Sequence, residues 1–351
     1  MRRFPFIFCT KERFLVAVTI RDVAALAGVS PSTVSRTCRN SPSISEETKQ
    51  RVRQAAKQLG YVMEGASAQS SAPRTIGVIL PPSAREVFEN PFYLEMIRGI
   101  NQFCNAHQYI STIVTGRDND EILAAIRLLV SSGAADAFIL LYSRQGDTVI
   151  DYLVQAKLMY VLIGKAYAYA NKTVYIDNDN FLAGQEATEY LIRRGHRRIA
   201  YLGSDNAYLF TADRRRGYQA ALALANIPVR SDYCVEMPSL DSGDAAVHAL
   251  IDRADRPTAI VVSDDLLGMT LERACLTRGL SIPRDISIIS FNNSLFAKLT
   301  SPRLTSVDLN SFQLGIEAAS QLISHIDRPE LMATKSIIPH RIVERESCRD
   351  I

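Results

Sequence analysis

Residues 19–36 read Thr19-Ile-Arg-Asp-Val-Ala-Ala-Leu-Ala-Gly-Val-Ser-Pro-Ser-Thr-Val-Ser-Arg36, a stretch that contains the start and end signals of two short helices. Thr19 can cap a helix from 20 to about 27, in which apolar residues recur at helical spacing. Gly28 breaks this helix, and Ser30 can cap a second one. Pro31 then takes the first helical position, where its missing N–H costs nothing. The spacing predicts two helices joined by a tight turn.

A third helix is predicted from Ser45, its N-cap, to Leu59, with Gly60 placed to end it. The first two helices and their turn have helix-turn-helix proportions, and the major groove of DNA accepts one such helix. The second helix would present Pro31, Ser32, Ser35, Arg36 and Arg39 outward, and the third adds Lys49, Arg51, Arg53 and Lys57 for phosphates. An ordinary three-helix bundle with a solvated basic face has the same proportions.

Charge is distributed unevenly along the 351 residues. The formal net charge is +3, but residues 1–76 carry 12 Lys and Arg against 5 Asp and Glu, a net of +7. The remainder therefore carries a net of −4. A basic head on a mildly acidic body is typical of nucleic-acid contact at one end of a chain, and a solvated charged surface fits the same numbers.

Composition excludes several classes of protein. Hydrophobic residues make up 47% and charged residues 22%, an ordinary globular balance, and no apolar run approaches the roughly 20 residues that span a bilayer. The six cysteines lie at least 29 positions apart, and the five histidines form no HExxH pattern. We therefore expect a reduced, cytoplasmic protein with no metal, no cofactor and no membrane segment.

The body of the chain alternates short apolar runs with amphipathic helices. Residues 62–75 are small and polar and are predicted to be a linker. After it, strands are predicted at 76–80, 109–114, 137–141, 160–163, 174–176, 199–202, 259–262 and 286–290, with helices at 92–107, 120–130, 181–193, 214–224 and 266–278 among those between them. Apolar strands with helical crossovers predict parallel, doubly wound sheets, and some 275 residues are too many for one such sheet. We expect two α/β lobes with a ligand cleft between them.

The stretch from Thr19 to Arg36 resembles the head signature of the LacI/GalR family of bacterial transcription repressors, and Ile44-Ser-Glu-Glu-Thr48 and Leu59-Gly-Tyr61 continue it. The resemblance covers nearly everything after residue 17. Several stretches of the body are similar to the maltose-operon repressors of Gram-positive bacteria: Leu140-Leu-Tyr-Ser143, Asp177-Asn-Asp-Asn180, Ala183-Gly184, Glu186-Ala-Thr-Glu-Tyr190, Val307-Asp-Leu-Asn-Ser311 and His340-Arg-Ile-Val-Glu-Arg-Glu346.

The resemblance implies an α/β core of two periplasmic-binding-protein-like lobes, preceded by a small all-α helix-turn-helix head. The head would span 18–61, the hinge or linker 62–75 and the core 76–351. Within the core, one lobe would comprise about 76–164 and 295–326, and the other about 165–294 and 327–351. Residues 1–17 would be an extension outside the family pattern, with 1–15 not part of the natural protein if Val16 is the true start.

The resemblance also implies which residues contact DNA: Thr19, Pro31, Ser32, Thr33, Ser35, Arg36, Arg39, Lys49 and Tyr61. Ser32 and Arg36 should do most of the base reading, because the side chain of Pro31 can neither donate nor accept a hydrogen bond. One such head reads a half-site, so the implied partner is a pseudo-palindromic operator bound by a homodimer.

The implied effector-binding residues are Phe92, Tyr93, Arg214, Asp264 and Asn292. Aromatic rings stack on sugar faces, and Arg, Asp and Asn pair with vicinal hydroxyls, so this set suits a carbohydrate, with maltose or a maltooligosaccharide implied by the subgroup. By themselves, the two aromatic residues equally fit core packing. Arg214, in a run of three arginines, reads by itself as a surface charge.

Two departures from the family pattern bear on mechanism. Asn292 replaces the usual Asp, and an amide can still donate and accept hydrogen bonds. The hinge departs more, because Met63-Glu-Gly-Ala-Ser-Ala-Gln-Ser70 has Ser70 where the family has the leucine that wedges into the minor groove.

Competing functions are a transport-type sugar-binding protein, which would lack residues 19–60, and an enzyme on a doubly wound fold. The sequence contains no GxxxxGK[ST] loop, no GxGxxG after the first predicted strand and no GxSxG elbow, so we expect no enzyme. Within the family, the alternative is a global catabolite-control regulator whose signal is a phosphorylated partner protein.

Overall fold

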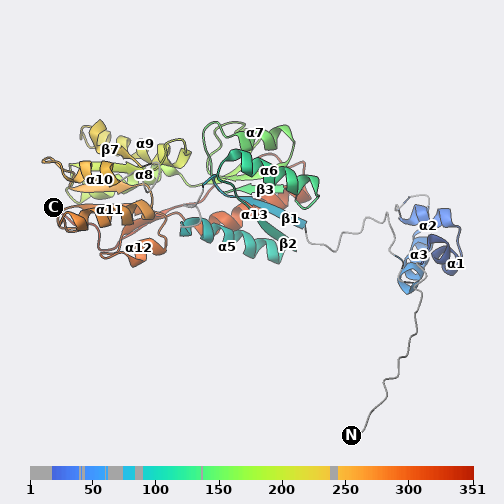
Figure 1. The fold of residues 1–351 in the computed structure, drawn as a ribbon. Coiled ribbons are helices and arrows are strands. Elements are labelled where there is room, and N and C mark those ends of the chain that lie inside the picture. Colours follow the sequence, from blue (N-terminus) through green and yellow to red (C-terminus); the bar gives the residue numbers. More distant parts are fainter. Residues whose placement is uncertain are drawn as a thin grey trace, which may run out of the picture. The chain divides into compact units, whose positions relative to one another are not determined.

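The computed structural model describes residues 18–38, 41, 44–59, 61, 74–83, 90–135, 137–237 and 244–351. The chain divides into two compact units, Met1–Pro73 and Arg74–Ile351 (Figure 1). The predicted extension at 1–17, Arg39, Gly60 and residues 62–73 of the predicted linker, including Met63 and Ser70, lie outside the described residues.

The head unit contains the three predicted helices, α1 (Ile20–Ala27), α2 (Pro31–Cys38) and α3 (Glu46–Leu59). Thr19 and Asp22 form a capping box at the start of α1, and Gly28 ends the helix at a φ of 65°, where a side chain would be strained. The Ser30 and Ser45 hydroxyls accept the N–H groups of Thr33 and Thr48 at 3.2 and 3.3 Å. The predicted caps and the tight turn are therefore confirmed.

Small and β-branched side chains fill the core of the head. Alanines and valines from all three helices are buried together with one cysteine: Val23, Ala24, Ala27, Val34, Cys38, Val52, Ala55 and Ala56. Small side chains let the helices approach closely, which leaves the polar residues of α2 on the outside.

Among the described residues of the second unit, strands form two six-stranded sheets, one in each lobe. The sheet of the first lobe runs in the order β11 (Lys335–Ile337), β5 (Val174–Asp177), β4 (Met159–Ile163), β3 (Ala137–Leu140), β1 (Arg74–Ile79) and β2 (Tyr109–Val114). Alternate residues of its strands enter two apolar clusters on opposite faces. One face packs against α5 (Pro91–Ala106) and α13 (Ser311–Asp327), and the other against α6 (Asn119–Ser131) and α7 (Thr148–Gln155).

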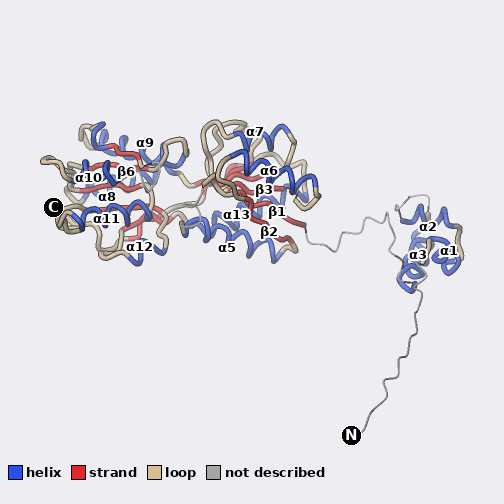
Figure 2. Tube along the Cα trace, viewed as in Figure 1, coloured by secondary structure: helices blue, strands red, loops and turns tan. Residues whose placement is uncertain are grey.

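The sheet of the second lobe runs in the order β12 (Arg341–Val343), β10 (Thr305–Asp308), β9 (Ser287–Phe291), β8 (Ala259–Val262), β6 (Ile199–Gly203) and β7 (Cys234–Glu236). Helices α8 (Asn180–Arg193) and α9 (Leu209–Leu224) pack on one face, and α10 (Asp244–Ile251), α11 (Asp265–Thr277) and α12 (Leu295–Leu299) on the other. A short 3-10 turn, η1 (Ser231–Tyr233), precedes β7. Figure 2 shows helices on both sides of the strands in each lobe, as the predicted doubly wound fold requires.

The described strands of both sheets pair in parallel, except that β12 runs antiparallel to β10. This exception follows from chain order, because β12 enters the second sheet directly after β11 leaves the first.

Within the described part of the chain, the backbone crosses between the lobes three times: after β5, after β10 and after β11. These crossings are tied together. The Asn178 amide donates to the carbonyl oxygens of Leu309 and Ile338 at 3.1 and 2.8 Å, and the Asn310 amide donates to that of Pro339 at 2.6 Å. The lobes are therefore joined by a hydrogen-bonded hinge.

The expected lobe boundaries were wrong in three places. The strand at 174–177 belongs to the first lobe, because Val174 pairs with Val161 of β4. Residues 335–337 belong there too, because Lys335 pairs with Tyr175, whereas 305–308 belong to the second lobe, where Thr305 pairs with Ile289. The first strand also begins at Arg74, inside the expected linker. The lobe to which a strand belongs depends on its pairing partner, which the sequence does not show, and the short strands at 305–308 and 335–337 carry little hydrophobic signal of their own.

Candidate functional site

The outward face of α2 is the one that the sequence predicted. Pro31, Ser32 and Arg36 are exposed, and Thr33 and Ser35 are partly exposed. The Ser32 hydroxyl lies 2.8 Å from that of Ser30, so its orientation is fixed by the residue that caps the helix. A short polar group and a guanidinium on one exposed helical face suit the reading of base edges.

Lys49 does not lie on the exposed face where we expected it. Its side chain is buried on α3, with the residue only 5% exposed, and its ammonium group bonds Glu46 Oε1 at 2.7 Å. This ion pair lowers the pKa of Glu46. The exposed cations of α3 are instead Arg51, Arg53 and Lys57.

The remaining predicted head residues that the structure describes are Thr19 and Tyr61. Thr19 is exposed, and both its amide and its hydroxyl donate to Asp22 at 2.7 Å. Tyr61 packs against the head core and is partly buried.

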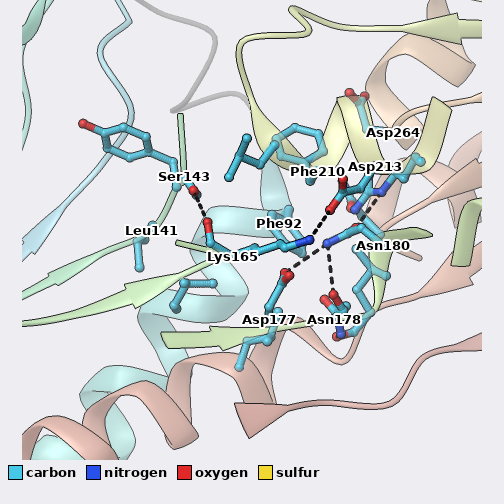
Figure 3. Close-up of a pocket in the computed structure, with 18 of the residues that line it drawn as sticks. Phe92, Leu141, Ser143, Lys165, Asp177, Asn178, Asn180, Phe210, Asp213 and Asp264 are labelled. Carbon is cyan, nitrogen blue, oxygen red and sulfur yellow. Dashed lines mark hydrogen bonds and ion pairs between the residues drawn. The ribbon is translucent and has the colours of Figure 1, made fainter. Parts of the chain in front are cut away.

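The five predicted effector residues, Phe92, Tyr93, Arg214, Asp264 and Asn292, all line a pocket between the two lobes. Its volume is about 680 Å³, including space open to solvent. The aromatic pair comes from the first lobe and the three polar residues from the second, as the sequence predicted. Figure 3 shows Phe92, Phe210 and Asp264 around this space.

The aromatic pair lies in the first turn of α5. Asn90 caps this helix by accepting the N–H of Phe92 at 3.1 Å, and Pro91 occupies its first position. The two rings meet edge to face, with centroids 5.8 Å apart. Phe92 packs against apolar clusters of both lobes, and burial raises the pKa of Tyr93, which keeps its hydroxyl neutral.

Arg214 is buried, not a surface charge. Its Nε donates to Asn180 Oδ1 at 2.9 Å and its Nη1 to the carbonyl oxygen of Ser263 at 2.5 Å. The guanidinium lies 4.8 and 4.5 Å from the rings of Phe210 and Phe291. Burial lowers the pKa of Arg214 to about 10, so the side chain stays positive at neutral pH.

Close packing of α8 and α9 sets the position of Arg214. A Cβ at Gly184 would lie 2.3 Å from the Arg214 carbonyl oxygen, and one at Gly217 would lie 2.0 Å from that of Phe181. These glycines let the two helix backbones touch, and the contact holds the Arg214 side chain against Asn180.

Asp264 and Asn292 each follow a strand of the second sheet. Asp264 caps α11, where its Oδ1 accepts the N–H of Leu267 at 2.9 Å, and burial raises its pKa to about 6. Asn292 adopts a φ of 97°, which its short polar side chain tolerates, and its backbone N–H donates to the carbonyl oxygen of Val307 at 2.9 Å. The Asp264 side chain is thereby held by the start of α11, and the Asn292 backbone is fixed beside β10.

Further pocket residues were missed by the sequence reasoning. They include Asn90, Tyr142, Ser143, Lys165, Asp177, Asn178, Asn180, Leu209, Phe210 and Asp213. Several of them follow the carboxyl ends of strands, where ligands bind in such sheets. Their position directly after a predicted strand is the sequence feature that could have identified them. Asp177 is an example: it ends β5, and Asn180 donates to its Oδ1 at 3.0 Å (Figure 3).

The described charges around the pocket nearly balance. Lys165 Nζ lies 3.7 Å from Asp213 Oδ2 across the two lobes, and Arg214 lies near Asp177 and Asp264. Burial raises the pKa of Asp177 to about 7. A pocket that combines aromatic rings with paired donors and acceptors suits a neutral polyhydroxyl compound.

The described residues contain no cluster of His, Cys, Asp or Glu that could hold a metal ion. They also contain no helix that combines the length and apolar character needed to cross a bilayer.

Comparisons with known proteins agree with this arrangement. Residues 19–63 match a family model described as bacterial regulatory proteins, lacI family, and residues 188–348 match one described as a periplasmic binding protein-like domain. The chain is 32% identical to the HTH-type transcriptional regulator MalR of Streptococcus pneumoniae over 338 residues, 93% of this chain and 99% of that protein.

Two further similarities bear on the effector. The chain is 29% identical to catabolite control protein A of Priestia megaterium over 338 residues, 95% of this chain and 99% of that protein. A solved complex of the transcriptional regulator CelR with cellobiose superposes with a TM-score of 0.73 at 28% identity, covering 94% of this chain and 99% of that one. These relatives are transcriptional regulators, not enzymes.

Proposed function

The chain belongs to the LacI family of bacterial regulatory proteins, and from that premise we propose that it represses carbohydrate-utilisation genes until a sugar releases it from its operator. We propose maltose or a short maltooligosaccharide as this sugar. The observation that carries the proposal is the pocket in which Phe92 and Tyr93 of one lobe meet Arg214, Asp264 and Asn292 of the other.

DNA recognition is assigned to the head. Ser32 and Arg36 are exposed on α2 and would read base edges, and Arg51, Arg53 and Lys57 on α3 would contact phosphates. The Lys49 ammonium group is already paired with Glu46, so Lys49 could contact a phosphate only if that ion pair broke. We propose that the head, residues 18–61, docks as one unit.

A disaccharide suits the chemistry of the pocket. Arg214 has five N–H donors, of which the described contacts use two, so three remain for hydroxyl groups. The Asp264 carboxylate and the Asn292 amide add acceptors and a further donor. The aromatic rings of Phe92 and Tyr93 supply the apolar surface on which a sugar ring stacks, and the matched CelR complex holds cellobiose, itself a disaccharide.

Sugar binding would change the DNA affinity of the head by changing the arrangement of the two lobes. A ligand that touches both lobes stabilises the arrangement in which they are together, and it alters DNA affinity only through that preference. The first lobe begins at Arg74, directly after the linker, so a change in this lobe reaches the linker first.

We further propose that the repressor is a cytoplasmic homodimer that reads a pseudo-palindromic operator, because one head reads only a half-site. Apolar side chains exposed on two neighbouring helices of the second lobe support a second copy as the partner. These are Met269 and Leu276 on α11, and Leu295 and Leu299, one turn apart, on α12.

A global catabolite regulator is the second candidate, favoured by the similarity to catabolite control protein A. The two candidates differ in the signal that they need. A purified repressor of the first kind responds to sugar alone, whereas the second kind requires a phosphorylated protein for its response.

Calorimetry with a panel of sugars tests the proposal. Maltose or maltotriose should bind, and the same sugar should weaken operator binding in a mobility shift. If a different sugar binds and maltose does not, the maltose assignment is wrong while the repressor remains. If no sugar binds and operator affinity changes only with a phosphorylated protein, the second candidate replaces the first.

A further inference from the structure

Two loops, one from each lobe, are hydrogen-bonded to each other at the pocket. The loop after β3 spans residues 142–146 of the first lobe, and the loop after β6 spans residues 204–208 of the second. Arg144 and Tyr208 form an isolated antiparallel bridge. On either side of this bridge, the Leu209 N–H donates to the carbonyl oxygen of Ser143 at 3.1 Å, and the Gln145 N–H donates to that of Ala207 at 2.9 Å.

Side chains add to this backbone bridge. Arg144 Nη2 lies 3.3 Å from Asp205 Oδ2, and its guanidinium lies 5.6 Å from the ring of Tyr208. That ring also meets Tyr142 of the first lobe edge to face, at 6.4 Å. Asp205 keeps its own loop in shape by accepting the N–H of Ala207 at 2.8 Å. Every one of the cross-lobe contacts requires the lobes to be together.

The bridge is continuous with the wall of the pocket. Tyr142 and Ser143 line the pocket from the first lobe, and Leu209 and Phe210 line it from the second. Figure 3 labels Ser143 and Phe210. Separation of the lobes would therefore break the bridge and also open the pocket in which the ligand binds.

We infer that Arg144, Asp205 and Tyr208 are positioning residues that form an inter-lobe clasp, which holds the lobes together over the effector pocket. The inference rests on the proposed function, because it assumes that the effector binds in this pocket. The clasp contributes only to the closed arrangement, so it raises effector affinity by increasing the population of the competent state. By the same reasoning, clasp and effector shift operator affinity in the same direction.

Weakening the ion pair of the clasp should lower effector affinity by a modest factor. The Arg144 and Asp205 side chains are 37% and 34% exposed, so we expect a three- to fivefold loss in Arg144→Gln or Asp205→Asn, measured by calorimetry. The double variant should lose no more than either single one, because the pair acts as a unit.

The matched control is Arg278→Gln. Arg278 pairs with Asp252 at 3.1 Å with 39% and 48% exposure, and both residues lie within the second lobe. The effector affinity of the Arg278→Gln variant should equal that of the wild type. Equal losses in the control, or no loss in any of the three clasp variants, would overturn the inference.

A covalent form of the clasp separates this inference from the effector assignment. Residues that face each other in an antiparallel bridge have Cα atoms roughly 4.5–5.5 Å apart, a distance that a disulfide spans. Arg144→Cys combined with Tyr208→Cys should therefore cross-link on oxidation, whereas the native cysteines of the described residues are buried or half-buried.

The oxidised double-cysteine variant should have the operator affinity of the effector-saturated wild type, and added sugar should not change that affinity. Reduction of the disulfide should restore the response to sugar. If it cross-links and still behaves like its reduced form, or if it does not cross-link although both thiols are reactive, the clasp is refuted. If oxidation alters operator binding while no sugar affects the wild type, the clasp stands and the effector assignment fails.

Discussion

Replacing Arg214 with alanine is the sharpest perturbation of the proposed effector pocket. The variant loses the bonds from Nε to Asn180 and from Nη1 to Ser263, together with the three N–H groups that we assign to the sugar. It also removes the cation that lies near Asp177 and Asp264. The head, a separate compact unit, keeps all of its contacts.

The expected loss follows from the number of hydrogen bonds. Hydrogen bonds to a charged group contribute about 1.5–3 kcal/mol each, so even two of the three N–H groups bonded to sugar hydroxyls would contribute at least about 3 kcal/mol. Since each 1.4 kcal/mol is tenfold in affinity, effector binding should weaken by roughly a hundredfold or more. Operator affinity without sugar should remain within about twofold of the wild-type value.

Calorimetry with maltose and a mobility shift on the same preparation measure the two quantities. Arg215→Ala is the matched control, because Arg215 is the next residue in α9 and pairs with Glu236 at 2.8 Å outside the pocket. Loss of a buried charge lowers stability, so a thermal melt must show a folded core. Asp264→Asn, which keeps a helix cap, is a second variant in case Arg214→Ala unfolds, and we expect it to weaken binding about tenfold.

One outcome would refute the reasoning. If Arg214→Ala binds sugar with unchanged affinity while Arg215→Ala or another residue outside the pocket abolishes binding, the effector does not occupy this pocket. A sugar-blind variant that still binds operator is the result that the structure predicts.

Three other outcomes are expected. Arg36→Ala should cost about 1–3 kcal/mol per half-site and relax base preference at one position, whereas an equal loss on random DNA, measured by mobility shift, would make Arg36 a phosphate contact. Gly217→Ala should push α8 from α9, since its Cβ meets the Phe181 oxygen at 2.0 Å, and should lower stability by about 1–3 kcal/mol in a denaturant titration. Burial raises the pKa of Asp264 to about 6 and that of Asp177 to about 7, so the folded core retains protons that the unfolded chain releases. The free energy of unfolding should therefore fall as pH rises from about 4 to 7, and Asp264→Asn with Asp177→Asn should flatten that slope in denaturant titrations across this range.

The head was predicted almost completely from sequence, because local signals determine it. The caps at Thr19, Ser30 and Ser45 each act on a residue three positions later, and the Gly28 N–H reaches carbonyl oxygens three and four positions earlier. Each of these signals is present as expected. The exception is Lys49, which a helical wheel places among the cations but which packs inward beside Glu46. Burial of a long side chain along its aliphatic stem leaves no mark in the sequence.

The core was predicted less completely, because its remaining features depend on contacts between distant residues. The strands at Lys335–Ile337 and Arg341–Val343 are three residues long and polar at their starts, so only their pairing partners identify them. The resemblance placed five pocket residues correctly at one cavity, but it did not point to Asp177 or Lys165. The clasp was also missed, since nothing local relates Arg144 to Asp205, 61 residues away.

Titration of an operator-bound complex with maltose tests the central claim most directly. The full chain, bound to DNA from upstream of its own gene, should lose operator affinity by a coupling of about 1–3 kcal/mol, or roughly 5–150-fold, as maltose saturates. Because coupling is reciprocal, operator should weaken maltose binding by the same factor. Operator affinity that stays constant at saturating maltose, with maltose demonstrably bound, would contradict the account.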